Sequence, residues 1–257
     1  MGKIGSEKLK AIALPAFFLA LFFALWEFSV KFFGINRITL PAPSDILAAA
    51  LADSNYLLSN LGITAFESVL GFMLGFAVAF FLAMLFVYSK NAKNTLYPFA
   101  IALKATPLVA LAPLIVLWLG SSVLPMIVMA ALVAFFPILV NSVEGLEIVE
   151  KEKLELFQTF GASKKDEFFK LRLPTSMPFI FSSLKIASTL AVVGAIIGEF
   201  TGSGAGLGFV IVNASYYLDI PLMFAAILAA SVWGILFFAL VSLVEKNAQF
   251  FQKLTAI

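Results

Sequence analysis

The feature that most constrains this chain is an uncharged run of 39 residues from Ala105 to Val143. A membrane-spanning helix needs about 20 mostly apolar residues, so this run is too long for one crossing. Gly120, Ser121, Ser122 and Pro125 lie near its middle and favour a turn at that point. The run therefore predicts two membrane-spanning helices joined by a short loop.

Four further segments have the same apolar character. Together the six predicted spans cover residues 11–33, 62–87, 96–119, 123–143, 179–201 and 223–245. The composition agrees, because 62% of the 257 residues are hydrophobic and only 12% are charged. A soluble domain is about half apolar and about a quarter charged. The sequence therefore predicts an all-α polytopic membrane protein with six transmembrane helices.

The first apolar run resembles a secretory signal peptide, because Lys3, Lys8 and Lys10 precede it. It continues to Phe33, however, and does not end in a small-residue cleavage motif. We therefore expect a retained first span. We divide the chain into a first helix with its outer loop (1–61), a five-helix core (62–245) and a tail (246–257).

The distribution of basic residues predicts the orientation. Cytoplasmic loops are enriched in Lys and Arg, and most of the 17 basic residues fall on one side if the N-terminus is cytoplasmic. The predicted cytoplasmic residues are Lys3, Lys8, Lys10, Lys90, Lys93, Lys151, Lys153, Lys164, Lys165, Lys170, Arg172, Lys246 and Lys253. Both termini and the segment 144–178 are thus expected in the cytoplasm.

Segment 144–178 is dense in charged residues, and a bilayer would exclude it. A helical spacing of apolar residues runs from Glu144 to Phe160, and Gly161 follows where a C-terminal glycine would end the helix. Ser163 and Asp166 are spaced as a capping box for a second short helix, which is expected to stop before Leu173-Pro174. The segment is therefore predicted to be a helix–glycine–helix elbow.

The elbow resembles the EAA loop of ABC-transporter permeases with the type I importer fold. The family pattern is Glu-Ala-Ala, a glycine four residues later, an aliphatic residue ten positions after that glycine, and an aliphatic-Pro pair. The chain matches these spacings, although two bulky residues replace the alanines. The resemblance implies an ATPase-coupling loop made of Glu155, Leu156, Phe157, Gly161, Ala162, Leu171, Leu173 and Pro174.

The segments 103–120, 135–146 and 198–215 are also similar to the nitrate/sulfonate/taurine subfamily of these permeases, in which a basic residue usually stands at the position of Glu67. The resemblance implies a prokaryotic inner-membrane subunit that imports a small solute such as nitrate, a sulfonate, taurine or a vitamin precursor. It implies three protein partners: an ATP-binding cassette ATPase, an external or periplasmic substrate-binding protein and a second permease copy. The chain has no G-x-x-x-x-G-K-[ST] motif, so ATP and magnesium are expected in the ATPase subunit.

Three prolines, Pro98, Pro107 and Pro113, interrupt the third predicted span. Irregular backbone at membrane depth is tolerated where protein or a water-filled cavity satisfies the freed groups. Lys104, Thr106 and Pro107 are therefore expected to form a bend that lines a translocation pathway. The other residues expected to line this pathway are Asn141, Lys185 and Glu199. Two alternatives stay open: Lys104 as a side chain that reaches the lipid headgroups, and Glu199 as a hydrated carboxylate at the membrane rim.

Glycines suggest further roles. Gly71 and Gly75, and likewise Gly194, Gly198 and Gly202, recur every fourth residue and predict faces on which helices pack closely. Gly204, Gly206 and Gly208 belong to an outer loop expected to face the binding protein. In the first outer loop, Ser44 or Asp45 is expected to cap a short helix.

Two other function classes remain at this stage. An ion-coupled secondary transporter would need buried coupling residues and usually has inverted repeats. A membrane-embedded enzyme would need a nucleophile with a base, or metal ligands. The chain has neither His nor Cys, which disfavours both classes, and no nucleic-acid partner or metal site is expected.

Overall fold

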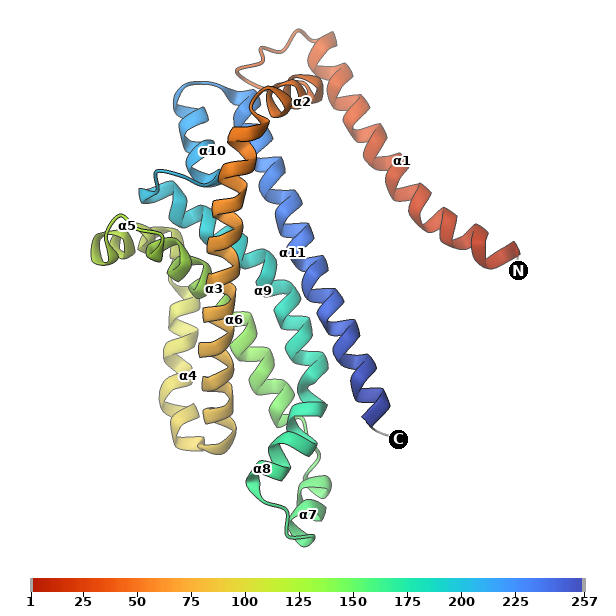
Figure 1. Ribbon diagram of the computed structural model, residues 1–257, viewed down its shortest axis with the longest axis vertical. Helices are drawn as coiled ribbons and strands as arrows, with labels where there is room; N and C mark the ends of the chain where they lie inside the picture. Colours follow the sequence, from red (N-terminus) through yellow and green to blue (C-terminus); the bar gives the residue numbers. More distant parts are fainter. Residues whose placement is uncertain (1, 256–257) are drawn as a thin grey trace. The chain divides into compact units, whose positions relative to one another are not determined.

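A computed structural model describes residues 2–255, and the side chains of residues 13–248, as an assembly of helices (Figure 1). The side chains of Lys3, Lys8, Lys10 and Lys253 and the last two residues of the predicted tail lie outside this description. The elements are α1 (Gly2–Phe32), α2 (Pro43–Ala52), α3 (Ser54–Tyr88), α4 (Lys90–Ala105), α5 (Leu108–Leu119), α6 (Leu124–Glu147), α7 (Lys151–Thr159), α8 (Lys164–Glu167), the π-helical turn η1 (Phe168–Arg172), α9 (Leu173–Gly202), α10 (Leu207–Tyr216) and α11 (Ile220–Thr255). The described chain is thus all-α, as predicted.

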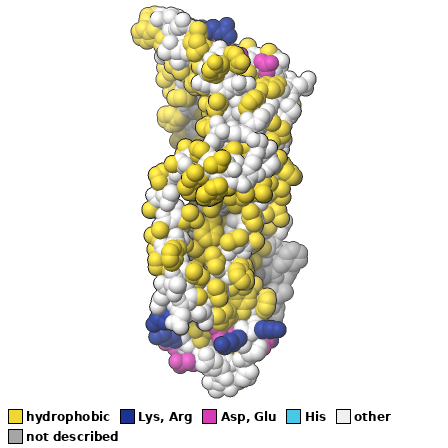
Figure 2. All heavy atoms as spheres, turned by 90° about the vertical axis from the view of Figure 1, so that its left-hand side faces the viewer, with side chains coloured by type: hydrophobic (Ala, Val, Ile, Leu, Met, Phe, Trp, Pro, Cys, Tyr) yellow, Lys and Arg dark blue, Asp and Glu magenta, His cyan; other side chains and the backbone are white. Residues whose placement is uncertain are grey.

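Within these residues, five helical segments are long and apolar enough to cross a membrane: Ala13–Phe32, α3, α6, Lys164–Gly202 and Ile220–Ala248. A sixth crossing exists if α4 and α5, which meet at 102°, count as one broken span. Figure 2 shows a face covered largely by hydrophobic side chains, with most of its charged side chains at the lower end. A bilayer requires this segregation, because charges are expensive in hydrocarbon.

The break between α4 and α5 lies at Thr106 and Pro107, both in extended backbone conformations. Proline lacks the N–H that would continue the helix, and it pushes the preceding residue out of the helical region. The predicted bend is therefore present. At 102° it divides the segment 96–119 into two helices, which form either one broken span or a re-entrant loop.

The chain forms two compact units. One comprises the residues up to Leu58 together with Val210–Leu228, and the other comprises Ser59–Phe209 and the residues from Ala229 onward. In the first unit, α2 begins at Pro43, with the Asp45 carboxylate accepting the Ala42 N–H at 3.2 Å. Asp45 therefore serves the cap as expected. Ser44 does not, because its hydroxyl and backbone N–H both bind the Glu27 carboxylate.

In the second unit, α6 and α9 form the most extensive helix pair among the described elements. Their backbones approach closely because Gly194 faces α6: a Cβ at this position would lie 2.7 Å from the Ala130 Cα and 2.8 Å from the Met129 carbonyl oxygen. On α3, Gly75 likewise lies against the Ala131 carbonyl. The two predicted close-packing faces are confirmed.

Replacing Gly194 with Ala should lower the free energy of unfolding by about 1–3 kcal/mol, because the added methyl meets backbone atoms that cannot change rotamer. The measurement is the thermal unfolding midpoint of the purified protein in detergent. Gly234→Ala on α11 is the matched control, since nothing lies within 4 Å of its added Cβ. An equal midpoint for the two variants would contradict the close approach.

Candidate functional site

The elbow begins where α6 ends. A break at residues 148–150 separates α6 from α7, so the single helix expected from Glu144 to Phe160 is two helices. Arg172 contributes to this break, because its Nη1 donates to the Leu146 carbonyl at 2.8 Å and satisfies one of the free carbonyls at the C-terminus of α6. Arg172 in turn pairs with Glu167 at 2.5 Å. The start of the elbow is therefore held by a residue from its far end.

Gly161 ends α7 as predicted. Its φ is +73°, a left-handed conformation that glycine adopts without penalty. The Ala162 N–H donates to the Phe157 carbonyl at 3.0 Å, and the Gly161 N–H donates to the Gln158 carbonyl at 2.9 Å. These two bonds form a Schellman motif, which satisfies the last carbonyls of the helix and reverses the chain.

The second helix, α8, also starts as predicted. The Ser163 Oγ accepts the Asp166 N–H and the Asp166 carboxylate accepts the Ser163 N–H, each at 3.2 Å. This reciprocal pair is a capping box. The local turn chemistry of the elbow therefore follows directly from its sequence.

The end of the second helix differs from the prediction. Instead of stopping before Leu173-Pro174, α8 passes through η1 into α9 without a break. In η1 the Leu173 N–H binds the Phe168 carbonyl five residues earlier. Such a π-turn is wider than an α-turn, and it places Pro174 in the first turn of α9, where its missing N–H does not interrupt a standard ladder.

The elbow presents apolar side chains at its surface. Leu156 is 54% exposed and Phe160 is 81% exposed, whereas Phe157 is half-buried. The two residues that replace the expected alanines thus point differently, with Leu156 outward and Phe157 inward. Glu155 is exposed beside Leu156. Exposed apolar residues next to charges are typical of a surface that binds another protein.

A second group of predicted residues lies at the bend between α4 and α5. Lys104 lines a cavity of about 150 Å³ with residues of α5, α6 and α9, among them Leu108, Phe136 and Leu190. Its Nζ lies 4.5 Å from the centre of the Phe136 ring, a cation–π contact. The cavity is therefore apolar, with two phenylalanines and one cationic group among its lining residues.

Three other predicted pathway residues have partners within the described chain. The Thr106 hydroxyl binds the Ala102 carbonyl at 3.1 Å, and the Asn141 amide binds the Pro137 carbonyl at 2.8 Å. Lys185 forms an ion pair with Glu245 of α11 at 2.8 Å and does not line the Lys104 cavity. The structure thus brings Lys104 and Pro107 to one bend, and it gives Lys185 a structural partner.

Glu199 lies in a buried polar network at the start of α10. It is only 1% exposed, so it is not the hydrated rim residue of the alternative reading. Its carboxylate accepts the Gly208 N–H at 2.5 Å and the Thr64 hydroxyl at 2.7 Å. The Thr64 oxygen accepts the Leu207 N–H at 2.8 Å. Side chains of α3 and α9 therefore satisfy the N–H groups that a helix N-terminus leaves free.

The same network includes the outer-loop glycines. The Gly206 N–H donates to the Asn60 Oδ1 at 2.7 Å, and its φ of +98° together with the adjoining Glu199 carboxylate leaves no room for a side chain. Gly206 and Gly208 are buried, whereas Gly204 is exposed. Of the three glycines expected to face outward, only Gly204 therefore lies at the surface of the described chain.

Sequence reasoning missed Asn60 and Thr64 and did not place Glu67 in any site. All three lie on one face of α3, and Glu67, which is 1% exposed, is buried beside Glu199. Their spacing of four and three residues inside an otherwise apolar span was the available signal. Polar residues at helical spacing in a membrane helix indicate a buried partner.

Residues 71–249 match the protein family described as binding-protein-dependent transport system inner membrane component. The chain is 33% identical to the formylaminopyrimidine transport permease ThiX of Halalkalibacterium halodurans, over 90% of this chain and 93% of that protein. It is 28% identical to the putative aliphatic sulfonates transport permease SsuC of Bacillus subtilis, over 93% and 86% of the two chains. A solved inward-facing structure of the MetNI methionine ABC transporter shares the fold, with a TM-score of 0.66 and 16% identity, over 76% of this chain and 97% of that chain.

Proposed function

The chain belongs to the family of binding-protein-dependent transport system inner membrane components, and we propose that it forms the solute pathway of an ATP-driven importer. In this proposal a separate ATPase subunit docks on the elbow, a substrate-binding protein delivers the solute from outside, and a second copy of the chain completes the pathway. The N- and C-termini and the elbow face the cytoplasm of a prokaryotic cell. ATP and magnesium bind to the ATPase.

The geometry of the elbow is the observation that carries this proposal. A short helix, a left-handed glycine and a capped second helix together form a protruding turn with apolar side chains on its surface. Because α8 continues through η1 into α9, a force on the elbow acts directly on a membrane helix. A continuous helix of this kind suits a subunit in which closure of the ATPase changes how the membrane helices pack.

The Lys104 cavity supports a pathway near the broken span. Its apolar walls, which include Phe135 and Phe136, and its single cation suit a small solute with a planar ring or an anionic group. The names of the two relatives point to different solutes, a formylaminopyrimidine and aliphatic sulfonates. We take the formylaminopyrimidine as the first ligand to test, because that relative has the higher identity.

The proposal is tested by reconstituting the chain with ATPase and substrate-binding-protein subunits of the same organism. ATP-dependent uptake into proteoliposomes, lost when the ATPase carries an inactive P-loop, is the expected result. Uptake driven by a proton or sodium gradient without the ATPase would identify a secondary transporter instead. Conversion of the solute without transport would identify a membrane-embedded enzyme.

Lys104→Met should lower the apparent affinity for the transported solute at least about tenfold, because it removes the only cation of the cavity described above. Lys104→Arg, which keeps the charge over Phe136, should retain most of the affinity. The measurement is solute uptake as a function of concentration in proteoliposomes.

The matched control removes the second lysine without leaving a lone charge. Lys185→Gln combined with Glu245→Gln neutralises both partners of the ion pair, and uptake should stay close to that of the unmodified protein. If Lys104→Met and this control behave alike, Lys104 has no role in the pathway.

A further inference from the structure

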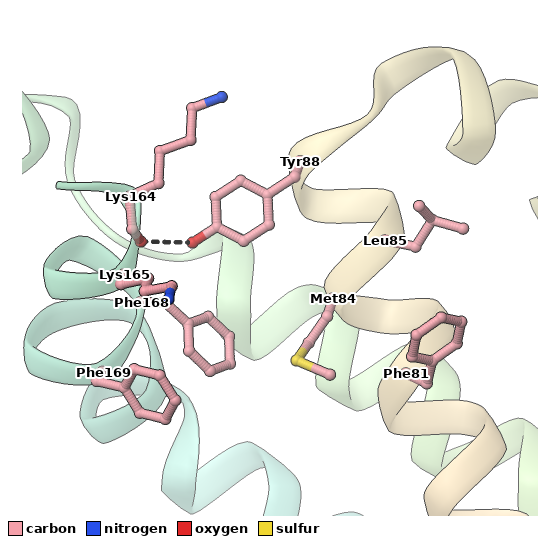
Figure 3. A pocket seen from close by; sticks show the side chains of 8 residues that line it. All are labelled: Phe81, Met84, Leu85, Tyr88, Lys164, Lys165, Phe168 and Phe169. Atoms are coloured by element: carbon pink, nitrogen blue, oxygen red, sulfur yellow. Dashed lines mark hydrogen bonds between the residues drawn. The ribbon is translucent and has the colours of Figure 1, made fainter.

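An open groove of about 430 Å³ lies between the last turns of α3 and the α8–η1 segment (Figure 3). Its walls are almost entirely apolar side chains, chiefly Phe81 and Leu85 from α3 and Phe169 from η1. Phe81 and Phe169 are 63% and 65% exposed, so the groove is not filled by the described part of the chain. Exposed aromatic residues on a membrane-spanning helix face the acyl chains of the bilayer, and here they line a concave surface.

The two ends of the groove lie at different depths in the membrane. Tyr88 lies at its other end, seven residues after Phe81, which corresponds to about 10 Å along the helix. The Tyr88 hydroxyl donates to the Lys164 carbonyl at 3.3 Å and joins the two walls. Tyr88 is the last residue of a membrane-spanning helix, where tyrosine is typical of the boundary between hydrocarbon and headgroups. The groove therefore runs from headgroup level into the hydrocarbon.

Two lysines stand at the headgroup end. Figure 3 shows the Lys164 side chain extending beyond Tyr88, away from Phe81, and Lys165 is the next residue of α8. Both are exposed, and neither has an ion pair among the described side chains. The neighbouring acidic residues form ion pairs with other basic residues, since Asp166 binds Lys170 at 2.6 Å and Glu167 binds Arg172. The groove thus ends in positive charge that its surroundings do not neutralise.

We propose that this groove binds an anionic phospholipid, with an acyl chain along Phe81, Leu85 and Phe169 and the phosphate at Lys164 and Lys165. An apolar channel at hydrocarbon depth with unpaired cations at headgroup level matches the two parts of such a molecule. The bound lipid would bridge the end of α3 and the start of the elbow. This site is separate from the Lys104 cavity and does not depend on which solute the protein transports.

Native mass spectrometry of the full-length protein, purified in mild detergent, tests the site. Phosphatidylglycerol and phosphatidylcholine with identical acyl chains are added in turn, and retention of the first bound lipid is compared. We expect a preference of about tenfold or more for phosphatidylglycerol, which Lys164→Gln combined with Lys165→Gln abolishes. Leu85→Trp, which fills the groove and keeps both charges, should reduce retention of either lipid.

The charge-matched control is Lys151→Gln combined with Lys246→Gln, since both residues are exposed and neither lines the groove. It should leave the preference unchanged. Glycerol phosphate at millimolar concentration should not compete, because it lacks the acyl chain. Equal retention of the two lipids by the unmodified protein, or a preference that survives Lys164→Gln/Lys165→Gln, would overturn the proposal. Crosslinking between the groove and a second copy of the chain would do so as well.

Discussion

Gly161→Val should abolish solute-stimulated ATP hydrolysis by the assembled transporter while leaving the chain inserted in the membrane. Gly161 has a φ of +73°, which costs a residue with a side chain about 1–2 kcal/mol, and a β-branched residue more. Nothing lies within 4 Å of a Cβ at this position, so the effect comes from the backbone and not from a collision. The Schellman motif would open, and the elbow would no longer present Leu156 and Phe160 in one orientation.

The measurement is ATPase activity with and without solute and binding protein in proteoliposomes, together with the amount of chain in the membrane fraction. Gly161→Asn should keep at least half of the stimulation, because asparagine tolerates the left-handed conformation. Gly34→Val is the matched control, since Gly34 has a φ of +61° in the turn after α1 and also has no neighbour within 4 Å. If Gly161→Val and Gly34→Val retain equal stimulation, the elbow geometry does not couple the subunits.

Glu199→Ala should release the start of α10 and lower the free energy of unfolding by at least about 2 kcal/mol. The substitution removes the acceptor of the Gly208 N–H and the partner of the Thr64 hydroxyl, and a buried group left unsatisfied costs about 1–3 kcal/mol. Hydrogen–deuterium exchange should become at least about tenfold faster at residues 206–208, whereas the α6–α9 pair should remain protected.

Glu67→Gln is the matched control within the same network. Glu67 accepts none of the described hydrogen bonds from the N–H groups of residues 206–208, and glutamine has nearly the same size and shape as glutamate. Exchange at residues 206–208 should therefore stay slow. Unchanged exchange in Glu199→Ala would show that the outer loop is held by packing alone.

Much of the elbow could be predicted because its determinants are local. Gly161 ends α7 through its own φ, and Ser163 with Asp166 starts α8 through hydrogen bonds across three residues. The continuation of α8 into α9 could not be read in the same way. Pro174 indicates a helix boundary in isolation, but the π-turn of η1 absorbs it, and Arg172 anchors that turn to the end of α6.

The candidate pathway likewise combines features that depend on local sequence with features that depend on helix packing. Pro107 predicted a bend, since proline acts on its own backbone, yet the angle of 102° and the cavity around Lys104 depend on how α4, α5 and α6 pack. Lys185 was grouped with Lys104 because both are cations in apolar spans. Its actual partner, Glu245, lies 60 positions away on another helix.

A multi-pass helical membrane protein with a bend at Pro107 and a glycine elbow of the permease type follows from the sequence alone. These properties depend on hydrophobicity and on backbone preferences, which act within a few residues. The capping of α10 by Asn60, Thr64 and Glu199, with Glu67 buried beside them, is visible only in the folded chain. Asn60 and Thr64 lie more than a hundred positions from the α10 N–H groups and the Glu199 carboxylate that they bind. These contacts depend on how far each helix is rotated about its axis, which no local pattern specifies.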